Sequence, residues 1–179
     1  MNRLISITST DDILPEYQDT PIGLLFEYHN LNRSQDRYSS AQMLISMCMD
    51  HRKRLQIPEN FAYIIRTGGA NLIYSEFKVS YAIAVGGVNS VALIGHTNCG
   101  MVDLLSRKDQ FVQGLVENAG CDRQWAEEHF NLSSTIFEIG NEIDFVVSEV
   151  KRLRLRYPKT QIAPLLYRVE DNLLYLIKE

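Results

Sequence analysis

The 179-residue sequence has few cysteines and no long hydrophobic run, and both shortages narrow the kinds of protein that it can encode. Its three cysteines are an odd number without regular spacing, which argues against a disulfide framework and for reduced thiols. No stretch approaches the roughly 20 apolar residues that cross a bilayer. Residues 1–8 also lack the apolar region of a secretory signal. We therefore expect a cytoplasmic protein with no membrane partner.

Basic residues are in the minority, which bears on nucleic-acid binding. The chain has 18 Lys and Arg against 22 Asp and Glu, and its formal net charge is −4. A protein that binds by neutralising phosphates needs a basic surface. The basic run at residues 151–156 ends an expected helix, where cations interact favourably with the helix dipole. We therefore predict no nucleic-acid partner.

Repeats, low-complexity tracts and linkers rich in Pro, Gly or Ser are absent as well. Hydrophobic residues make up 45% of the chain, enough for one buried core, so we expect a single domain over residues 1–179. Three short apolar runs, residues 43–48, 61–65 and 90–94, are nearly continuous in hydrophobicity. Such runs are typical of parallel strands covered on both faces. Residues 75–86 are expected to form a crossover helix between the second and third strands.

These elements predict an α/β fold with a mainly parallel central β-sheet flanked by helices. A threonine followed by a proline is typical of a helix start, so we expect a helix over residues 21–35 within an N-terminal arm of residues 1–38. An apolar stripe at helical spacing predicts another helix over residues 138–156. Residues 161–177 have the pattern of a C-terminal hairpin, which would add an edge strand to the sheet.

Residues with metal-binding chemistry occur where two of the expected strands end. Cys48 ends the first strand, and His96 follows the third strand, with Cys99 three residues further along. The carboxyl ends of parallel strands meet at one edge of a sheet, so these side chains are expected to converge. Two thiolates and an imidazole favour zinc over harder cations. Three protein ligands leave one tetrahedral position open, as in catalytic zinc sites.

Cys99 is also expected to lie at the N-terminus of a helix that begins at Gly100, whose dipole would lower the pKa of the thiol. His51 lies between two charged residues and has two interpretations, a proton shuttle or a loop residue that faces away from the metal, of which the second is favoured. Other residues with ligand chemistry are interpreted as surface or packing residues: His29, Asp103, Cys121 and His129.

The pattern Cys-x-Asp-x-Arg at residues 48–52, followed by His-x-x-Cys-Gly at residues 96–100, resembles the β-class carbonic anhydrases. The resemblance is strongest over residues 43–105, and the short length of the chain is most similar to the compact archaeal and bacterial branch of that family. It implies a mainly parallel sheet and a homodimer, or a larger even-numbered homo-oligomer. In this family N-terminal helices embrace the partner, a part that residues 21–35 would play.

The resemblance assigns a role to each motif residue. It implies a zinc ion held by Cys48, His96 and Cys99, and a catalytic dyad of Asp50 and Arg52. The implied activity is the reversible hydration of CO₂ to bicarbonate by a zinc-bound hydroxide. Asp50 would orient this hydroxide, while Arg52 would keep the carboxylate off the metal. Because two thiolates cancel the charge of Zn²⁺, we expect the rate to rise with pH well above neutrality.

Substrate positioning is expected from Gly68, Gly69 and Gly100, because glycine allows a close approach of the backbone. The resemblance is incomplete in this region. The family usually shows Asn-Ala-Gly where this chain has Thr67-Gly68-Gly69, and often has His-Gly where this chain has Ala163-Pro164.

Other functions fit the same residues. Relatives of the family use the same zinc chemistry to hydrolyse carbonyl sulfide or carbon disulfide, and they differ in the access path and not in the ligands. A non-catalytic zinc-binding protein would result if Asp50 closed the tetrahedron permanently, but the presence of Arg52 argues against this. Redox sensing through Cys48 and Cys99 is the least favoured, because the chain has no Cys-x-x-Cys motif.

Overall fold

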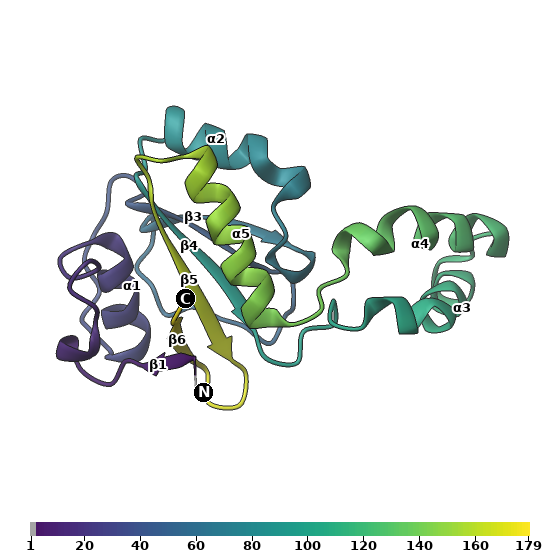
Figure 1. Ribbon diagram of the computed structural model, residues 1–179, viewed down its shortest axis with the longest axis horizontal. Helices are drawn as coiled ribbons and strands as arrows, with labels where there is room; N and C mark the ends of the chain where they lie inside the picture. Colours follow the sequence, from purple (N-terminus) through teal and green to yellow (C-terminus); the bar gives the residue numbers. More distant parts are fainter. Residues whose placement is uncertain (1–2) are drawn as a thin grey trace.

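The computed structural model describes residues 3–179 and has at its centre a six-stranded sheet in the order β1-β6-β5-β4-β2-β3 (Figure 1). The strands are β1 (Leu4–Ser6), β2 (Met43–Cys48), β3 (Ala62–Thr67), β4 (Ser90–His96), β5 (Gln161–Arg168) and β6 (Leu173–Ile177). The four strands β3, β2, β4 and β5 are parallel, and β6 and β1 extend the sheet in antiparallel fashion. The predicted mainly parallel α/β sheet and its C-terminal hairpin are confirmed.

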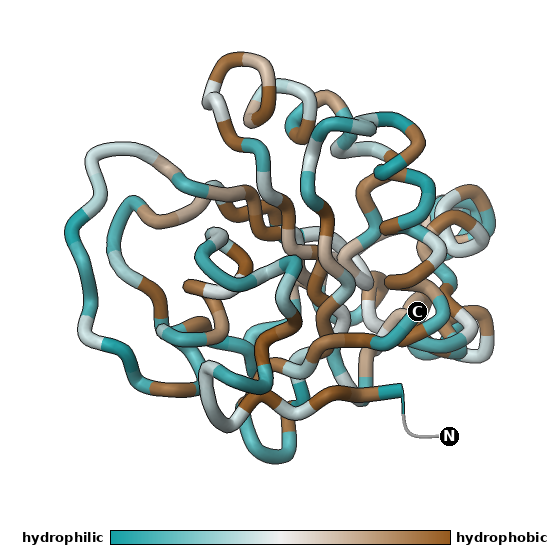
Figure 2. Tube along the Cα trace, turned by 60° about the vertical axis from the view of Figure 1, so that its left-hand side comes forward, coloured by the Kyte–Doolittle hydropathy of each residue, from teal (hydrophilic) through white to brown (hydrophobic). Residues whose placement is uncertain are grey.

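Strands β2 and β4 lie in the interior of the sheet, which explains their continuous hydrophobic sequences. Every residue of both strands is buried. Successive side chains point to opposite faces, so that Met43 and Ile45 belong to one hydrophobic cluster and Leu44 to the other. Figure 2 shows the hydrophobic stretches gathered in the strands at the centre and the hydrophilic ones along the outer loops.

Within residues 3–179, five α-helices accompany the sheet: α1 (Pro21–Asn30), α2 (Glu76–Ala84), α3 (Lys108–Ala119), α4 (Arg123–Phe137) and α5 (Glu142–Arg156). α1 covers one face, and α2 and α5 cover the other (Figure 1). Gly95 of β4 lets α5 approach closely, since a Cβ there would lie 2.7 Å from Cγ2 of Val146. α3 and α4 form a hairpin that extends away from the sheet (Figure 1). No helix among residues 3–179 combines the length and apolar character needed to cross a membrane.

The helices differ in part from their predicted bounds. α1 begins as expected, with Pro21 at its first position and the Thr20 side chain accepting a hydrogen bond from the Gly23 N–H, but it ends at residue 30 and not at 35. α5 begins at residue 142 and not at 138, because the Asn141 side chain caps it there. The strand β1 and the helix α3 were not predicted. β1 has only three residues, and its place depends on pairing with the distant β6.

Candidate metal centre

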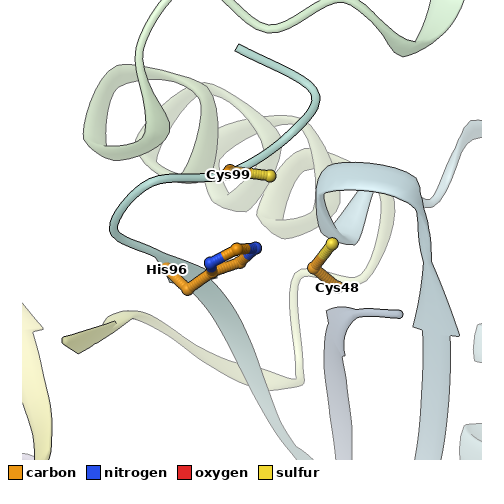
Figure 3. A group of neighbouring side chains, drawn as sticks. All are labelled: Cys48, His96 and Cys99. Atoms are coloured by element: carbon orange, nitrogen blue, oxygen red, sulfur yellow. The ribbon is translucent and has the colours of Figure 1, made fainter. Parts of the chain in front are cut away.

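Cys48, His96 and Cys99 come together at the carboxyl edge of the sheet, with their side chains pointing toward one another (Figure 3). Cys48 is the last residue of β2, and His96 is the last residue of the neighbouring β4. Cys99 lies in the turn that follows. All three side chains are buried, and their ligand atoms lie within 4.8 Å of one another. This is the convergence expected from two adjacent parallel strands.

The orientation of the His96 ring suits a metal ligand. Its Nδ1 lies 2.9 Å from the carbonyl oxygen of Thr97, which can only accept a hydrogen bond, so Nδ1 carries the proton. Nε2 therefore has a free lone pair. This atom is buried and has no hydrogen-bond partner within residues 3–179. A backbone carbonyl that fixes the ring of a histidine in this way is a common feature of zinc sites.

The two thiols lie close enough to shift each other's pKa in opposite directions. A hydrogen bond from Cys99 lowers the pKa of Cys48 to about 3, against the effect of burial. The same hydrogen bond, together with burial, raises the pKa of Cys99. The pair therefore presents one thiolate, and a bound cation would displace the remaining proton. Two sulfur donors and one nitrogen donor in a buried site fit a tetrahedral zinc ion with one open position.

The predicted helix directly after Cys99 is wrong. Residues 100–103 form turns, and the first helical segment is a short 3₁₀-helix, η4 (Leu104–Arg107). Asp103 has a φ of 54°, in the left-handed region, which interrupts a right-handed helix at this point. A helix dipole therefore does not lower the pKa of Cys99, and Asp103 is an exposed turn residue.

Asp50 and Arg52 form a close ion pair beside the three ligands. Oδ1 of Asp50 accepts hydrogen bonds from the backbone N–H and from Nε of Arg52, at 2.9 and 3.0 Å. Oδ2 accepts from Nη2 at 2.6 Å and from Nε at 3.1 Å. These bonds hold the pKa of the Asp50 carboxyl well below its usual range. Among the described residues, the group of clustered ligand atoms does not include Asp50.

Arg66 fixes the loop that carries the dyad. Its Nη1 donates to the carbonyl oxygen of Cys48 at 3.2 Å, and its Nη2 donates to that of Lys53 at 3.2 Å. The guanidinium therefore joins both ends of the loop to β3. Sequence reasoning missed this role, because an arginine that binds backbone carbonyl oxygens has no recognisable motif.

Glu170 and Glu142 hold the loop between His96 and Cys99. Glu170, in the turn between β5 and β6, accepts from Oγ1 of Thr97 and from Nδ2 of Asn98, both at 2.8 Å. Arg52 donates to the carbonyl oxygen of Asn98 at 2.9 Å, so the dyad is tied to the same loop. Glu142 accepts from the Cys99 N–H at 3.3 Å. Sequence reasoning missed both glutamates.

The three glycines expected to position substrate have different surroundings. Gly68 and Gly69 lie in the 3₁₀-helix η2 (Gly68–Ala70), packed against Met101, where a Cβ on Gly69 would be 3.3 Å from the Met101 Cβ. Gly69 also has a φ of 61°, which favours glycine. Gly100 faces open space, since a Cβ there would have no neighbour within 4 Å. Their role toward a substrate stays a prediction.

The other histidines and Cys121 do not join the cluster. His51 is exposed. His29 is buried on α1 and accepts a hydrogen bond from the Gln56 N–H at Nδ1, 3.0 Å away. His129 stacks on Trp125 with ring centroids 5.0 Å apart. Cys121 is a half-buried free thiol.

An apolar pocket adjoins the metal centre. It has a volume of about 320 Å³ and lies between the α3–α4 hairpin and the edge of the sheet. Met49, Gly68 and Met101 line it on the side of the ligands, and Phe130 and Phe137 line it on the side of α4. Met101 belongs both to this pocket and to the hydrophobic cluster that contains Cys48 and Cys99, while none of the three ligands itself lines the pocket.

Comparisons with known proteins identify the fold. No protein-family model matches the sequence, and no match is found among curated proteins. Solved structures do match. A carbonic anhydrase from Glaciozyma antarctica is 26% identical over 79% of this chain and 85% of that chain, with a TM-score of 0.59. β-Carbonic anhydrase isoform I from Trichomonas vaginalis is 22% identical over 83% and 90%, with a TM-score of 0.62. The apo form of a carbon disulfide hydrolase is 19% identical over 75% and 77%, with a TM-score of 0.57. The resemblance to the β-class carbonic anhydrases is thus confirmed in the fold.

Proposed function

We propose that this protein is a zinc-dependent carbonic anhydrase, which catalyses the reversible hydration of CO₂ to bicarbonate. The observation that carries the proposal is the convergence of Cys48, His96 and Cys99, with the Asp50 carboxylate held beside them by Arg52. The likeness of the fold to carbonic anhydrase structures supports it. The geometry of the site and the likeness of the fold together support a zinc ion with three protein ligands and a fourth position open to water.

The three ligands have the properties that a zinc enzyme needs. A zinc ion held by Cys48, His96 and Cys99 would supply the Lewis acidity that activates water for attack on CO₂. The carbonyl oxygen of Thr97 holds the His96 ring in the required tautomer. Burial of the ligands keeps bulk water away from them, which strengthens electrostatic interactions in the site.

Asp50 is positioned to orient the attacking water. A carboxylate offers about four acceptor positions. Arg52 directs its backbone N–H, Nε and Nη2 at them, with Nε shared between both oxygens. These four contacts use all four positions, so the water would share or displace the longest of them, the 3.1 Å contact from Nε to Oδ2, and Asp50 would then direct its lone pair toward CO₂. The same bonds restrain Asp50 from becoming a ligand itself, which argues against a permanently closed, non-catalytic site.

Hydrolysis of carbonyl sulfide or carbon disulfide is the second candidate function. The apolar pocket beside Met49 and Met101 favours uncharged, weakly polar substrates, a description that fits these molecules as well as CO₂. A carbon disulfide hydrolase is also among the structures with the same fold. The metal ligands would be identical for all three substrates, so only parallel assays distinguish them.

We also propose that the protein is a homodimer, with its main contact at an apolar face on β3 and α2. This dimer face consists of Tyr63, Ile64, Phe77, Tyr81 and Val85, all of which are exposed. β3 is at the edge of the sheet, so its backbone is free to meet another chain. Exposed apolar side chains clustered in this way mark protein interfaces.

We further propose that the protein is cytoplasmic. Its three free cysteines support this location, because thiols stay reduced in the cytoplasm.

The test combines metal analysis with three parallel assays. The purified protein is expected to contain close to one zinc ion per chain and to hydrate CO₂, faster at about pH 8.5 than at about pH 7. Carbonyl sulfide and carbon disulfide are assayed on the same sample. Zinc-loaded protein that acts on neither CO₂ nor the sulfur compounds would overturn the proposal.

A further inference from the structure

Lys53 is a buried cation to which the proposed reaction gives no role. Its side chain is 0% exposed, and its Nζ has no hydrogen-bond partner in the part of the chain that the structure describes. Oδ1 of Asp50 lies 4.0 Å from Nζ. Burial lowers the pKa of Lys53, which indicates surroundings of low polarity.

A fully buried lysine needs a compensating negative charge. Lysine is almost never fully buried unless it is paired, because desolvation of an ammonium group is strongly unfavourable. The negative groups that act on Lys53 are Asp50 and the thiolate of Cys48, joined by Cys99 when that thiol also ionises. These are the groups of the metal centre itself. Arg66, a nearby cation, uses its donors on backbone carbonyl oxygens.

Arg52 and Lys53 act on the Asp50 carboxylate in different ways. Arg52 provides directional hydrogen bonds, but its side chain is 38% exposed, so solvent and salt screen its charge. Lys53 makes no hydrogen bond to Asp50, since 4.0 Å is too long. Its charge, however, is shielded from water, so solvent and salt screen it less than they screen the charge of Arg52.

We propose that Lys53 is a positioning residue, whose buried charge acts with Arg52 to hold the Asp50 carboxylate beside the metal position and not on it. This rests on the proposed function, in which Asp50 gates the open ligand position. Without Lys53 the carboxylate would lose part of the attraction that keeps it in its present place. It would then compete with water and with small anions for the metal.

The Lys53→Met variant tests this with little disturbance of the fold. The methionine side chain keeps most of the length of the lysine side chain but carries no charge. Replacing a buried ion by an apolar residue is commonly tolerated. All hydrogen bonds to Asp50 remain. Lys53→Gln serves as a second variant. Lys159→Met is the matched control, because Lys159 is exposed before the amino end of β5, away from the carboxyl edge.

The measurement uses cobalt(II)-substituted protein and does not depend on catalysis. Absorption spectra report the ligand set of the metal, and titration with azide reports whether the fourth position is open. We expect Lys53→Met to change the spectrum and to weaken azide binding at least about threefold, and Lys159→Met to change neither. In an Asp50→Asn background, Lys53→Met is expected to leave the spectrum unchanged and to have a smaller effect on azide.

An equal loss of azide affinity in both backgrounds would overturn the proposal, because it would show a general effect of charge and not one exerted through Asp50. Loss of fold in both Lys53→Met and Lys53→Gln would also overturn it, by assigning Lys53 to structure alone. A wild-type protein that binds no cobalt would overturn this proposal and the proposed function together. Normal cobalt and azide binding without CO₂ hydration would contradict only the proposed function.

Discussion

The residues of the candidate centre divide into ligands and residues that position them. His96 offers a free Nε2 because its other nitrogen is bound to a backbone carbonyl, and Cys48 offers a thiolate because Cys99 donates to it. Asp50 has the chemistry of a ligand, but its oxygens are engaged by Arg52. Whether the protein is an enzyme or a non-catalytic zinc-binding protein therefore depends on whether the Asp50 carboxylate pairs with Arg52 or binds the metal.

The Arg52→Ala variant tests that distinction. We expect it to retain zinc, because Arg52 is not a ligand, and to lose about a hundredfold or more in kcat, because Asp50 is released toward the metal. Zinc content and CO₂ hydration are measured on the same preparation. Arg54→Ala, at an exposed position two residues away, is the control and should behave like the wild type. Unchanged turnover in Arg52→Ala would refute the gate.

At the scale of the elements, the metal centre depends on loops that follow strands. β2 and β4 set the direction of Cys48 and His96, while the turn between β5 and β6 reaches across to hold the loop that leads to Cys99. Glu170 makes this contact with two hydrogen bonds. Such outer contacts typically change metal affinity by about 10- to 100-fold when removed.

We therefore expect Glu170→Ala to bind zinc about 10-fold or more weakly than the wild type, since the loop between His96 and Cys99 becomes mobile. Competition with a chromophoric chelator measures the affinity. Glu59→Ala removes the same charge from an exposed position elsewhere and should leave zinc binding unchanged. Equal affinity in wild type and Glu170→Ala would show that the loop holds its shape without this glutamate.

Sequence reasoning succeeded where one strong pattern governs an element. The interior strand β2 has the predicted bounds, because a continuous hydrophobic run is typical of a strand that is buried on both faces. Cys48 lies near His96, as expected for the carboxyl ends of parallel strands. It failed after Cys99, where the left-handed conformation of Asp103 breaks the expected helix. It also missed Glu170, because a contact between residues 73 positions apart has no local signature.

At the scale of the whole molecule, the fold leaves one apolar surface exposed. The sheet is covered by α1 on one face and by α2 and α5 on the other, yet its β3 edge and the outer side of α2 remain apolar and uncovered. Surfaces of this kind are stable in water when a second chain covers them.

The Phe77→Glu variant tests the proposed dimer face. Phe77 is 81% exposed at its centre on α2, and a buried charge there would oppose association. We expect the wild type to have the mass of a dimer by light scattering and the variant to be a monomer. Leu155→Glu, at an equally exposed position on α5, is the control and should remain dimeric. A monomeric wild type would refute the proposal.

The most direct test of the central claim is the rate of CO₂ hydration by the zinc-loaded protein, measured by stopped flow from about pH 6 to about pH 9. We predict turnover that rises toward alkaline pH, because two thiolates neutralise the charge of the zinc ion and reduce its power to acidify water. The Cys48→Ser variant, which lacks one thiolate, should lose zinc and rate together. A rate no higher than that of uncatalysed hydration, with zinc bound, would contradict the account.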